Sequence, residues 1–231
     1  MTRFSPSRLL QLYQQLFGHF GPQHWWPAET PLEVVLGAIL TQNTNWSNVE
    51  KALANLRRAG ALTVVRLAAL PDEELQQLIR PAGFFRQKTA RIKRFIRHLE
   101  DHHRGELKRL LNQELNRARH ELLALDGIGP ETADSILLYA GGLASFVIDA
   151  YTVRLLLRLE LIDSDPGYDV LRLAIMQSLP VDAELFNEFH ALIVRTCKLY
   201  CRKRNPICRE CPLLPDCPTG QKLSGMTGKV P

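Results

Sequence analysis

The sequence of 231 residues lacks an apolar run long enough to cross a membrane. Its longest apolar stretch, ILLYAGGLASFVI, is shorter than the roughly 18 residues that a spanning helix needs. The first residues, MTRFSPSRLL, lack the sustained apolar run and small-residue cleavage site of a secretory signal. We therefore expect a soluble cytoplasmic protein with no membrane partner.

Alternating polar and apolar residues, the pattern of a half-buried strand, are also missing, as are internal repeats and low-complexity segments. Apolar residues instead recur at three- and four-residue steps, as in RLLQLYQQLF and QKTARIKRFIRHL. Pro31, Pro71 and Pro180 stand where helix starts and breaks are expected. The pattern predicts an all-α protein of about ten helices with short loops.

Acidic residues are the minority among the charged ones. The 29 Lys and Arg residues exceed the 24 Asp and Glu residues, which gives a formal charge of +5. This balance favours a polyanionic partner such as DNA or RNA over an acidic small molecule, although many basic proteins bind no nucleic acid.

The five cysteines are an odd number, and four of them are close together. Cys201, Cys208, Cys211 and Cys217 are separated by six, two and five residues. This grouping indicates a metal or cluster site rather than a disulfide framework. Ligand chemistry alone leaves zinc and an iron–sulfur cluster equally good, with free thiols as the third alternative. Cys197 lies on a helical face and is assigned to the buried core.

Two glycines occur two residues apart in LDGIGPETAD, residues 125–134. Gly127 and Gly129 permit backbone conformations that side chains forbid, so the N–H groups around Ile128 can point at one anion beside a helix start at Pro130. Such a turn would hold a phosphate without reading a base. An ordinary interhelical turn with a glycine cap is the alternative.

The segment RKRNPI between the first two clustered cysteines is basic. Its residues Arg202, Lys203 and Arg204 lie on a loop whose backbone a cluster would hold in place, which suits phosphate binding. A solvated charge run that balances an anionic cluster is the alternative.

Together these motifs resemble a known family. The cysteine spacing resembles the [4Fe-4S] loop of the endonuclease III family of DNA glycosylases, and L-x-G-I-G-x-x-T-A, from Leu125 to Ala133, resembles the helix-hairpin-helix of the same superfamily. The resemblance covers roughly residues 25–217 and implies two helical lobes with DNA bound across the cleft between them. One lobe would span residues 28–141 and contain the hairpin. The other would combine residues 1–27 with the cluster-bearing residues 142–217, leaving 218–231 as a flexible tail.

The resemblance also implies a catalytic carboxylate. The superfamily places an essential Asp eighteen residues beyond the position of Glu131, and Asp149 in FVIDAYTVRLL occupies that place. Taken alone, an Asp before a helix is most often an N-cap. Bifunctional members carry a Lys where this chain has Glu131, and a carboxylate cannot form the imine that leads to strand cleavage. The prediction is hydrolysis without lyase activity, with ionised Asp149 stabilising positive charge on the sugar.

The three tryptophans fall in the N-terminal quarter of the chain. HWWPAETP contains Trp25, Trp26 and Pro27, and ILTQNTNW ends in Trp46; these segments resemble the 3-methyladenine branch, in which they line the base pocket and a Glu such as Glu131 replaces the catalytic Lys. Indole faces attract cationic rings by about 0.5 to 2 kcal/mol per contact, so Trp25 and Trp46 are expected to sandwich an alkylated purine. Burial in the core is the alternative for each Trp.

Two further residues match DNA-contacting positions of the family. Gln42 in LTQNT matches the Gln that fills the gap left by the extruded base, and Phe84 in GFFRQKTA matches the wedge. An apolar ring between base steps holds open a kink, whereas a core position is the alternative for Phe84. The helix that follows supplies further candidate phosphate contacts, with simple solvation as the alternative for some of them: Arg86, Lys88, Arg91 and Lys93.

The sequence thus predicts a monomeric alkylpurine-DNA glycosylase without lyase activity that acts on damaged double-stranded DNA in the nucleoid. A glycosylase for uracil, mismatched or oxidised pyrimidines is the second hypothesis, and a non-catalytic damage-binding or redox-sensing DNA protein is the third. The chain also departs from the family pattern. Asp126 replaces the usual Pro of the hairpin, and some members of the methylpurine branch lack the cysteine loop.

Overall fold

The computed structural model describes residues 4–225, and this range contains α-helices and no β-strand. The predicted all-α class is confirmed. There are 13 α-helices in the described range, more than the sequence predicted, because α4, α7 and α13 have only five or six residues each and are too short to show a helical period. No helix among these residues is long and apolar enough to span a membrane.

The chain divides into two compact units. The central unit contains residues 26–143, and the terminal unit contains the described residues before and after it. The lobe boundaries expected from the sequence were residues 28 and 141. The central unit contains both helices of the predicted hairpin, and the terminal unit contains Asp149 and the clustered cysteines.

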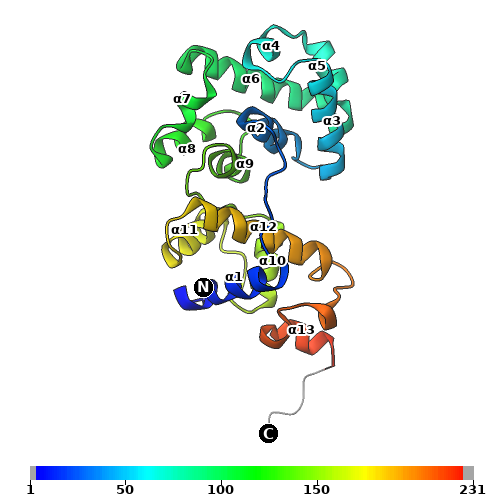
Figure 1. The fold of residues 1–231 in the computed structure, drawn as a ribbon, viewed down its shortest axis with the longest axis vertical. Helices are drawn as coiled ribbons and strands as arrows, with labels where there is room; N and C mark the ends of the chain where they lie inside the picture. The colour runs from blue at the N-terminus through cyan, green and yellow to red at the C-terminus, as the bar shows by residue number, and fades with distance from the viewer. Residues whose placement is uncertain (1–3, 226–231) are drawn as a thin grey trace. The chain divides into compact units, whose positions relative to one another are not determined.

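The central unit is built around one fully buried helix, α2 (Pro31–Leu40). Each residue from Leu32 to Leu40 is buried, because PLEVVLGAIL is apolar nearly all round and so must be covered on every side. Figure 1 shows α2 with α3, α6 and α9 as its neighbours. The other helices of this unit are α3 (Trp46–Arg58), α4 (Val64–Ala69), α5 (Asp72–Ile79), α6 (Phe85–His103), α7 (Leu107–Leu111), α8 (Leu115–Leu123) and α9 (Pro130–Ser135), which continues as a π-helix over Ile136–Ala140.

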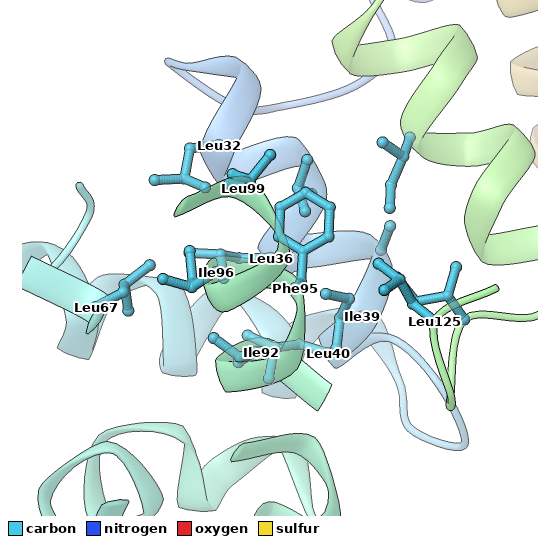
Figure 2. Close-up of a cluster of buried hydrophobic side chains, with 14 of the residues drawn as sticks. Leu32, Leu36, Ile39, Leu40, Leu67, Ile92, Phe95, Ile96, Leu99 and Leu125 are labelled. Atoms are coloured by element: carbon cyan, nitrogen blue, oxygen red, sulfur yellow. The ribbon is translucent and has the colours of Figure 1, made fainter. Parts of the chain in front are cut away.

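The core of the central unit forms where α2 meets α6. Ile92, Phe95, Ile96 and Leu99 of α6 recur at the spacing of one helical face, and all four are buried. Figure 2 shows them against the leucines and isoleucine of α2, with Leu67 and Leu125 at the margins. Because α2 also contacts α9, α6 and the hairpin pack against the same helix.

The terminal unit is organised around α12 (Ala183–Leu199), which contacts both α1 and α10. Phe146 lies between two aromatic residues of α12, with ring centroids 5.6 Å from Phe186 and 5.8 Å from Phe189, and all three side chains are fully buried. The remaining helices of this unit are α1 (Pro6–Phe20), α10 (Ala150–Arg158), α11 (Tyr168–Ser178) and α13 (Pro218–Leu223).

The prediction of a flexible tail over residues 218–231 is wrong for its first part, because residues 218–223 form α13. Pro218 occupies the first turn, and the sulfur of Cys217 accepts a hydrogen bond from the N–H of Gly220 at 3.2 Å, so this helix is capped by a residue of the cysteine loop. Residues 226–231 of that prediction lie outside the described residues.

Candidate functional site

Asp149 is the N-cap of α10. Its Oδ1 accepts hydrogen bonds from the N–H of Thr152 at 2.8 Å and from the hydroxyl of Thr152 at 3.0 Å. The capping role that the sequence offered as an alternative is therefore present. Only one carboxylate oxygen makes these bonds, so Oδ2 remains available for another interaction. The side chain of Asp149 is 13% exposed.

His190 of α12 is the neighbour of that second oxygen, and the sequence analysis missed it. Its Nε2 lies 3.5 Å from Oδ2 of Asp149. Burial alone would raise the pKa of Asp149, but the charge and hydrogen bond of His190 together with the bonds from Thr152 outweigh it and lower the pKa below its usual value. The carboxylate is consequently held in the ionised form that the proposed chemistry needs.

The predicted hairpin runs from α8 through residues 124–129 to α9. Gly127 has φ +88°, which side chains rarely adopt, and a Cβ there would lie 2.5 Å from Nε of Arg91. Gly129 does not need its freedom, since φ is −86°; it is the N-cap of α9, and a Cβ would meet nothing within 4 Å. Ile128 between them is 4% exposed and anchors the turn in the core. The backbone conformation therefore explains the glycine at position 127. Neither conformation nor lack of space requires the glycine at position 129.

A buried ion pair joins the two hairpin helices, and sequence reasoning missed it too. Both guanidinium bonds from Arg119 of α8 go to Asp134 of α9, at 2.9 and 3.1 Å, and Asp134 has no exposed side-chain surface. A bidentate pair of this kind adds a directional link between the two helices.

Gln42 is attached to the hairpin. Its amide nitrogen donates to the carbonyl of Gly127 at 3.1 Å and to the hydroxyl of Thr132 at 2.9 Å, while Arg91 donates to its amide oxygen. The structure thus brings together Gln42 and the hairpin glycine, two predicted DNA contacts, and engages both ends of the Gln42 amide within the protein.

Phe84 is exposed rather than in the core. It keeps 60% of its surface in solvent and has φ +45°, an uncommon conformation for a residue with a bulky side chain. Such strain next to an exposed ring is of the kind found at functional positions. The core alternative for Phe84 is excluded, and its role as a wedge remains a prediction.

The candidate phosphate contacts after Phe84 are partly wrong. Lys88 is 1% exposed, and its ammonium donates to the carbonyls of Leu40 at 2.9 Å and Ala82 at 2.7 Å. Lys93 likewise donates to carbonyls at the end of α4, including that of Leu67 at 2.8 Å. Carbonyls at helix ends lack intrahelical partners, and these two lysines satisfy them. Of the four candidates, Arg86 remains exposed.

The predicted pocket residues divide between the units. Trp26 meets Trp46 edge to face with ring centroids 4.9 Å apart and lies 5.0 Å from the ring of Tyr139 in the same unit. Gly37 of α2 makes room for this group, because a Cβ there would lie 3.2 Å from Trp26 and 3.4 Å from Trp46. We call Trp26, Trp46 and Tyr139 the aromatic cluster; Tyr139 was not predicted.

The other predicted pocket residues lie outside this aromatic cluster. Trp25 belongs to the terminal unit, where the ammonium of Lys198 lies 5.6 Å from its ring centroid. Pro27 is exposed. Glu131 is exposed in the first turn of α9, where its charge also favours the helix start.

The four clustered cysteines line one apolar pocket in the terminal unit, together with Leu155 and Leu213. None of the four forms a disulfide. Burial raises the pKa of Cys211 to about 11 and also raises the pKa of Cys208 and Cys217. Backbone and guanidinium N–H groups face two of the sulfurs, Gly220 to Cys217 at 3.2 Å and Arg158 to Cys201 at 3.3 Å. Convergent sulfurs with N–H donors fit a soft metal or an iron–sulfur group.

Two arginines of α10 hold the start of the cysteine loop. Arg154 donates to the carbonyl of Cys201 at 2.8 Å, and Arg158 donates to that of Arg202 at 2.9 Å. The predicted basic side chains of Arg202, Lys203 and Arg204 are all exposed. The helix that begins at Asp149 therefore also positions the basic loop.

These features agree with the comparison with known proteins. The profile of the HhH-GPD superfamily of base excision DNA repair proteins matches residues 36–180. This chain belongs to that superfamily. Its membership confirms the predicted family and the predicted coarse function, a base-excision repair glycosylase.

Relatives of this HhH-GPD protein extend the match beyond the profile. A protein of Methanocaldococcus jannaschii named "putative DNA repair glycosylase" is 43% identical over 210 residues, which are 90% of this chain and 95% of that protein. Endonuclease III of Bacillus subtilis is 29% identical over 154 residues, which are 67% of this chain and 66% of that protein.

Solved structures show the same fold. An endonuclease III in a non-covalent complex with DNA has a TM-score of 0.81 at 24% identity, covering 96% of this chain and 99% of that one. The 3-methyladenine DNA glycosylase of H. pylori, bound to 1,N6-ethenoadenine, has a TM-score of 0.72 at 27% identity, covering 84% of this chain and 98% of that one.

Proposed function

We propose that this protein is a monofunctional DNA glycosylase that hydrolyses the N-glycosidic bond of alkylated purines in damaged double-stranded DNA. The observation that carries the reaction type is the state of Asp149, an ionised carboxylate with one oxygen bound to Thr152 and the other facing His190. The absence of an amine at position 131 supports hydrolysis over lyase chemistry.

In the proposed reaction the bond between C1′ of the sugar and the base nitrogen breaks, and its electron pair leaves with the base. The carboxylate of Asp149 stabilises the positive charge that develops on the sugar. A water oxygen, which the carboxylate of Asp149 helps to position, then bonds to C1′, and the water's proton passes to that carboxylate and on to solvent. A base that already carries a positive charge leaves without a general acid, which is why alkylated purines suit this site.

The aromatic cluster supports the choice of base. Trp26, Trp46 and Tyr139 offer large π surfaces, which attract electron-poor and cationic rings more strongly than neutral ones. The likeness to the H. pylori 3-methyladenine enzyme, bound there to a modified adenine, points in the same direction. Phe84, Gln42 and the Gly127 turn would contact the duplex, with the basic loop as a further phosphate contact.

A lesion panel tests this function. Duplexes with 3-methyladenine, 7-methylguanine, uracil or thymine glycol are incubated with the protein, and free base and strand breaks are measured with and without alkali. We expect release of the alkylpurines and breaks only after alkali. Release of pyrimidine lesions alone would refute the alkylpurine assignment, and nicking without alkali would refute hydrolysis. Binding without release of any base would instead favour a damage-binding protein.

Cys201, Cys208, Cys211 and Cys217 would hold a [4Fe-4S] cluster. The cluster would supply a rigid support for the basic loop, since four covalent bonds to one group fix the loop backbone. The four cysteines are separated by six, two and five residues. This spacing resembles that of endonuclease III and favours the cluster over zinc.

Metal analysis of the anaerobically purified protein tests the cluster. We expect about four iron atoms and matching sulfide per chain, with the broad visible absorption of iron–sulfur charge transfer. Cys208→Ser should lose the iron, whereas Cys197→Ser should keep it, because Cys197 is buried on α12 and does not line the pocket. Stoichiometric zinc at these cysteines without iron would contradict the assignment.

A further inference from the structure

Three side chains that can bind a metal ion converge in the central unit, which contains none of the cysteines. His98 and His103 belong to α6, and Glu121 belongs to α8. Nε2 of His98 lies 2.6 Å from Oε1 of Glu121, and Nε2 of His103 contacts the same oxygen. One atom from each residue falls within 4.8 Å of the others. Neither histidine entered the sequence analysis.

We propose that His98, His103 and Glu121 form a zinc site. Two imidazoles and one carboxylate are a ligand set that zinc uses in proteins, with water in the fourth position. A tetrahedral zinc ion with ligands about 2.0 Å away separates them by about 3.3 Å. The 2.6 Å contact must therefore open by about 0.7 Å, which side-chain rotations can supply.

The surroundings of the three residues fit a cation. The Nε2 atoms of both rings face one carboxylate oxygen, so a single ion placed among them could contact all three side chains. His103 lies in the last turn of α6, where the helix dipole is negative. The side chains are only 13%, 9% and 21% exposed for His98, His103 and Glu121, so water competes weakly for them.

Gln113 adds a contact of the kind found behind metal ligands. Its amide nitrogen donates to Oε2 of Glu121 at 2.7 Å, which leaves Oε1 directed at the two histidines. Hydrogen bonds that orient ligating carboxylates are a regular part of metal sites, and their removal typically costs 10- to 100-fold in metal affinity.

The site would connect the end of α6 to α8, the first helix of the hairpin. A bound ion would replace a contact between flexible side chains with bonds to one centre. Two residues of α8 would then be held, Glu121 by the ion and Arg119 by its pair with Asp134. Binding to the folded state alone raises the thermal midpoint of unfolding.

Zinc titration of the full-length protein tests the proposal. The protein is treated with a chelator, its visible absorption and iron content are checked, and zinc chloride binding is measured by calorimetry. We expect one zinc ion per chain and a higher thermal midpoint. His98→Asn and Glu121→Gln should each weaken binding at least about tenfold, and Gln113→Leu about 10- to 100-fold.

Matched controls separate this site from other zinc-binding groups. His120→Asn removes an exposed histidine adjacent in sequence to Glu121, and this variant should bind zinc as the parent does. Cobalt bound here should lack the strong thiolate charge-transfer bands that cobalt at the cysteines would show. Equal zinc affinity in parent, His98→Asn and Glu121→Gln, or no binding by the folded parent, would overturn the proposal.

Discussion

Replacing Asp149 with Asn is expected to abolish base release while the protein still binds damaged duplex DNA. Asn caps a helix as well as Asp does, so α10 should keep its start. What is lost is the negative charge that stabilises the developing charge on the sugar. The expected decrease in the single-turnover rate of release is about 10²- to 10⁴-fold.

A matched variant controls for the loss of a capping carboxylate. Asp182 is the N-cap of α12, is exposed, and accepts from the N–H of Glu184 at 2.8 Å, so Asp182→Asn makes the same chemical change at another helix start. It should retain the parent rate. If Asp149→Asn releases base at the parent rate, the carboxylate is not catalytic. If it loses DNA binding together with release, its effect is structural.

The dependence of release on pH reports on the same carboxylate. Since its folded-state pKa is lowered, Asp149 stays ionised as the pH falls below the usual value for an Asp, and release should persist to correspondingly acidic conditions. Removing the nearby charge in His190→Gln takes away one cause of that lowering. The acid limb of the rate profile should then move to higher pH, whereas a purely structural role of His190 would lower the rate at every pH without moving the limb.

Local sequence patterns predicted much of the fold. The helical period of α6 placed Ile92, Phe95 and Leu99 on one buried face, and a cap before α10 was evident from Asp149 alone. The pattern did not resolve α4, α7 and α13, because five or six residues leave no room for a period of 3.6 to repeat.

Contacts between distant elements could not be read in the same way, because one sequence does not record which side chains pair. Signals for two of them were nevertheless present. Lys88 stands four residues before Ile92, on the buried face of α6, and His190 stands four residues after Phe186, on the buried face of α12. A polar residue in the apolar stripe of a helix must find a partner, and here the partners are helix-end carbonyls and Asp149.

Arg119→Met should destabilise the central unit by about 3 to 5 kcal/mol, the usual cost of leaving one buried charge without its partner. Asp134 has no exposed surface, and both of its oxygens bind the guanidinium of Arg119. Urea unfolding followed by tryptophan fluorescence would measure the loss, since Trp26 and Trp46 lie in this unit.

Two further variants show whether the stranded charge is the cause. Arg117→Met alters an exposed arginine of the same helix and should leave the unfolding midpoint almost unchanged. Adding Asp134→Leu to Arg119→Met removes the remaining charge, so the double variant should recover part of the lost stability. A double variant less stable than Arg119→Met would mean that Asp134 supports the hairpin through its other contacts. In that case, the ion pair would not be the main contact through which Asp134 stabilises the hairpin.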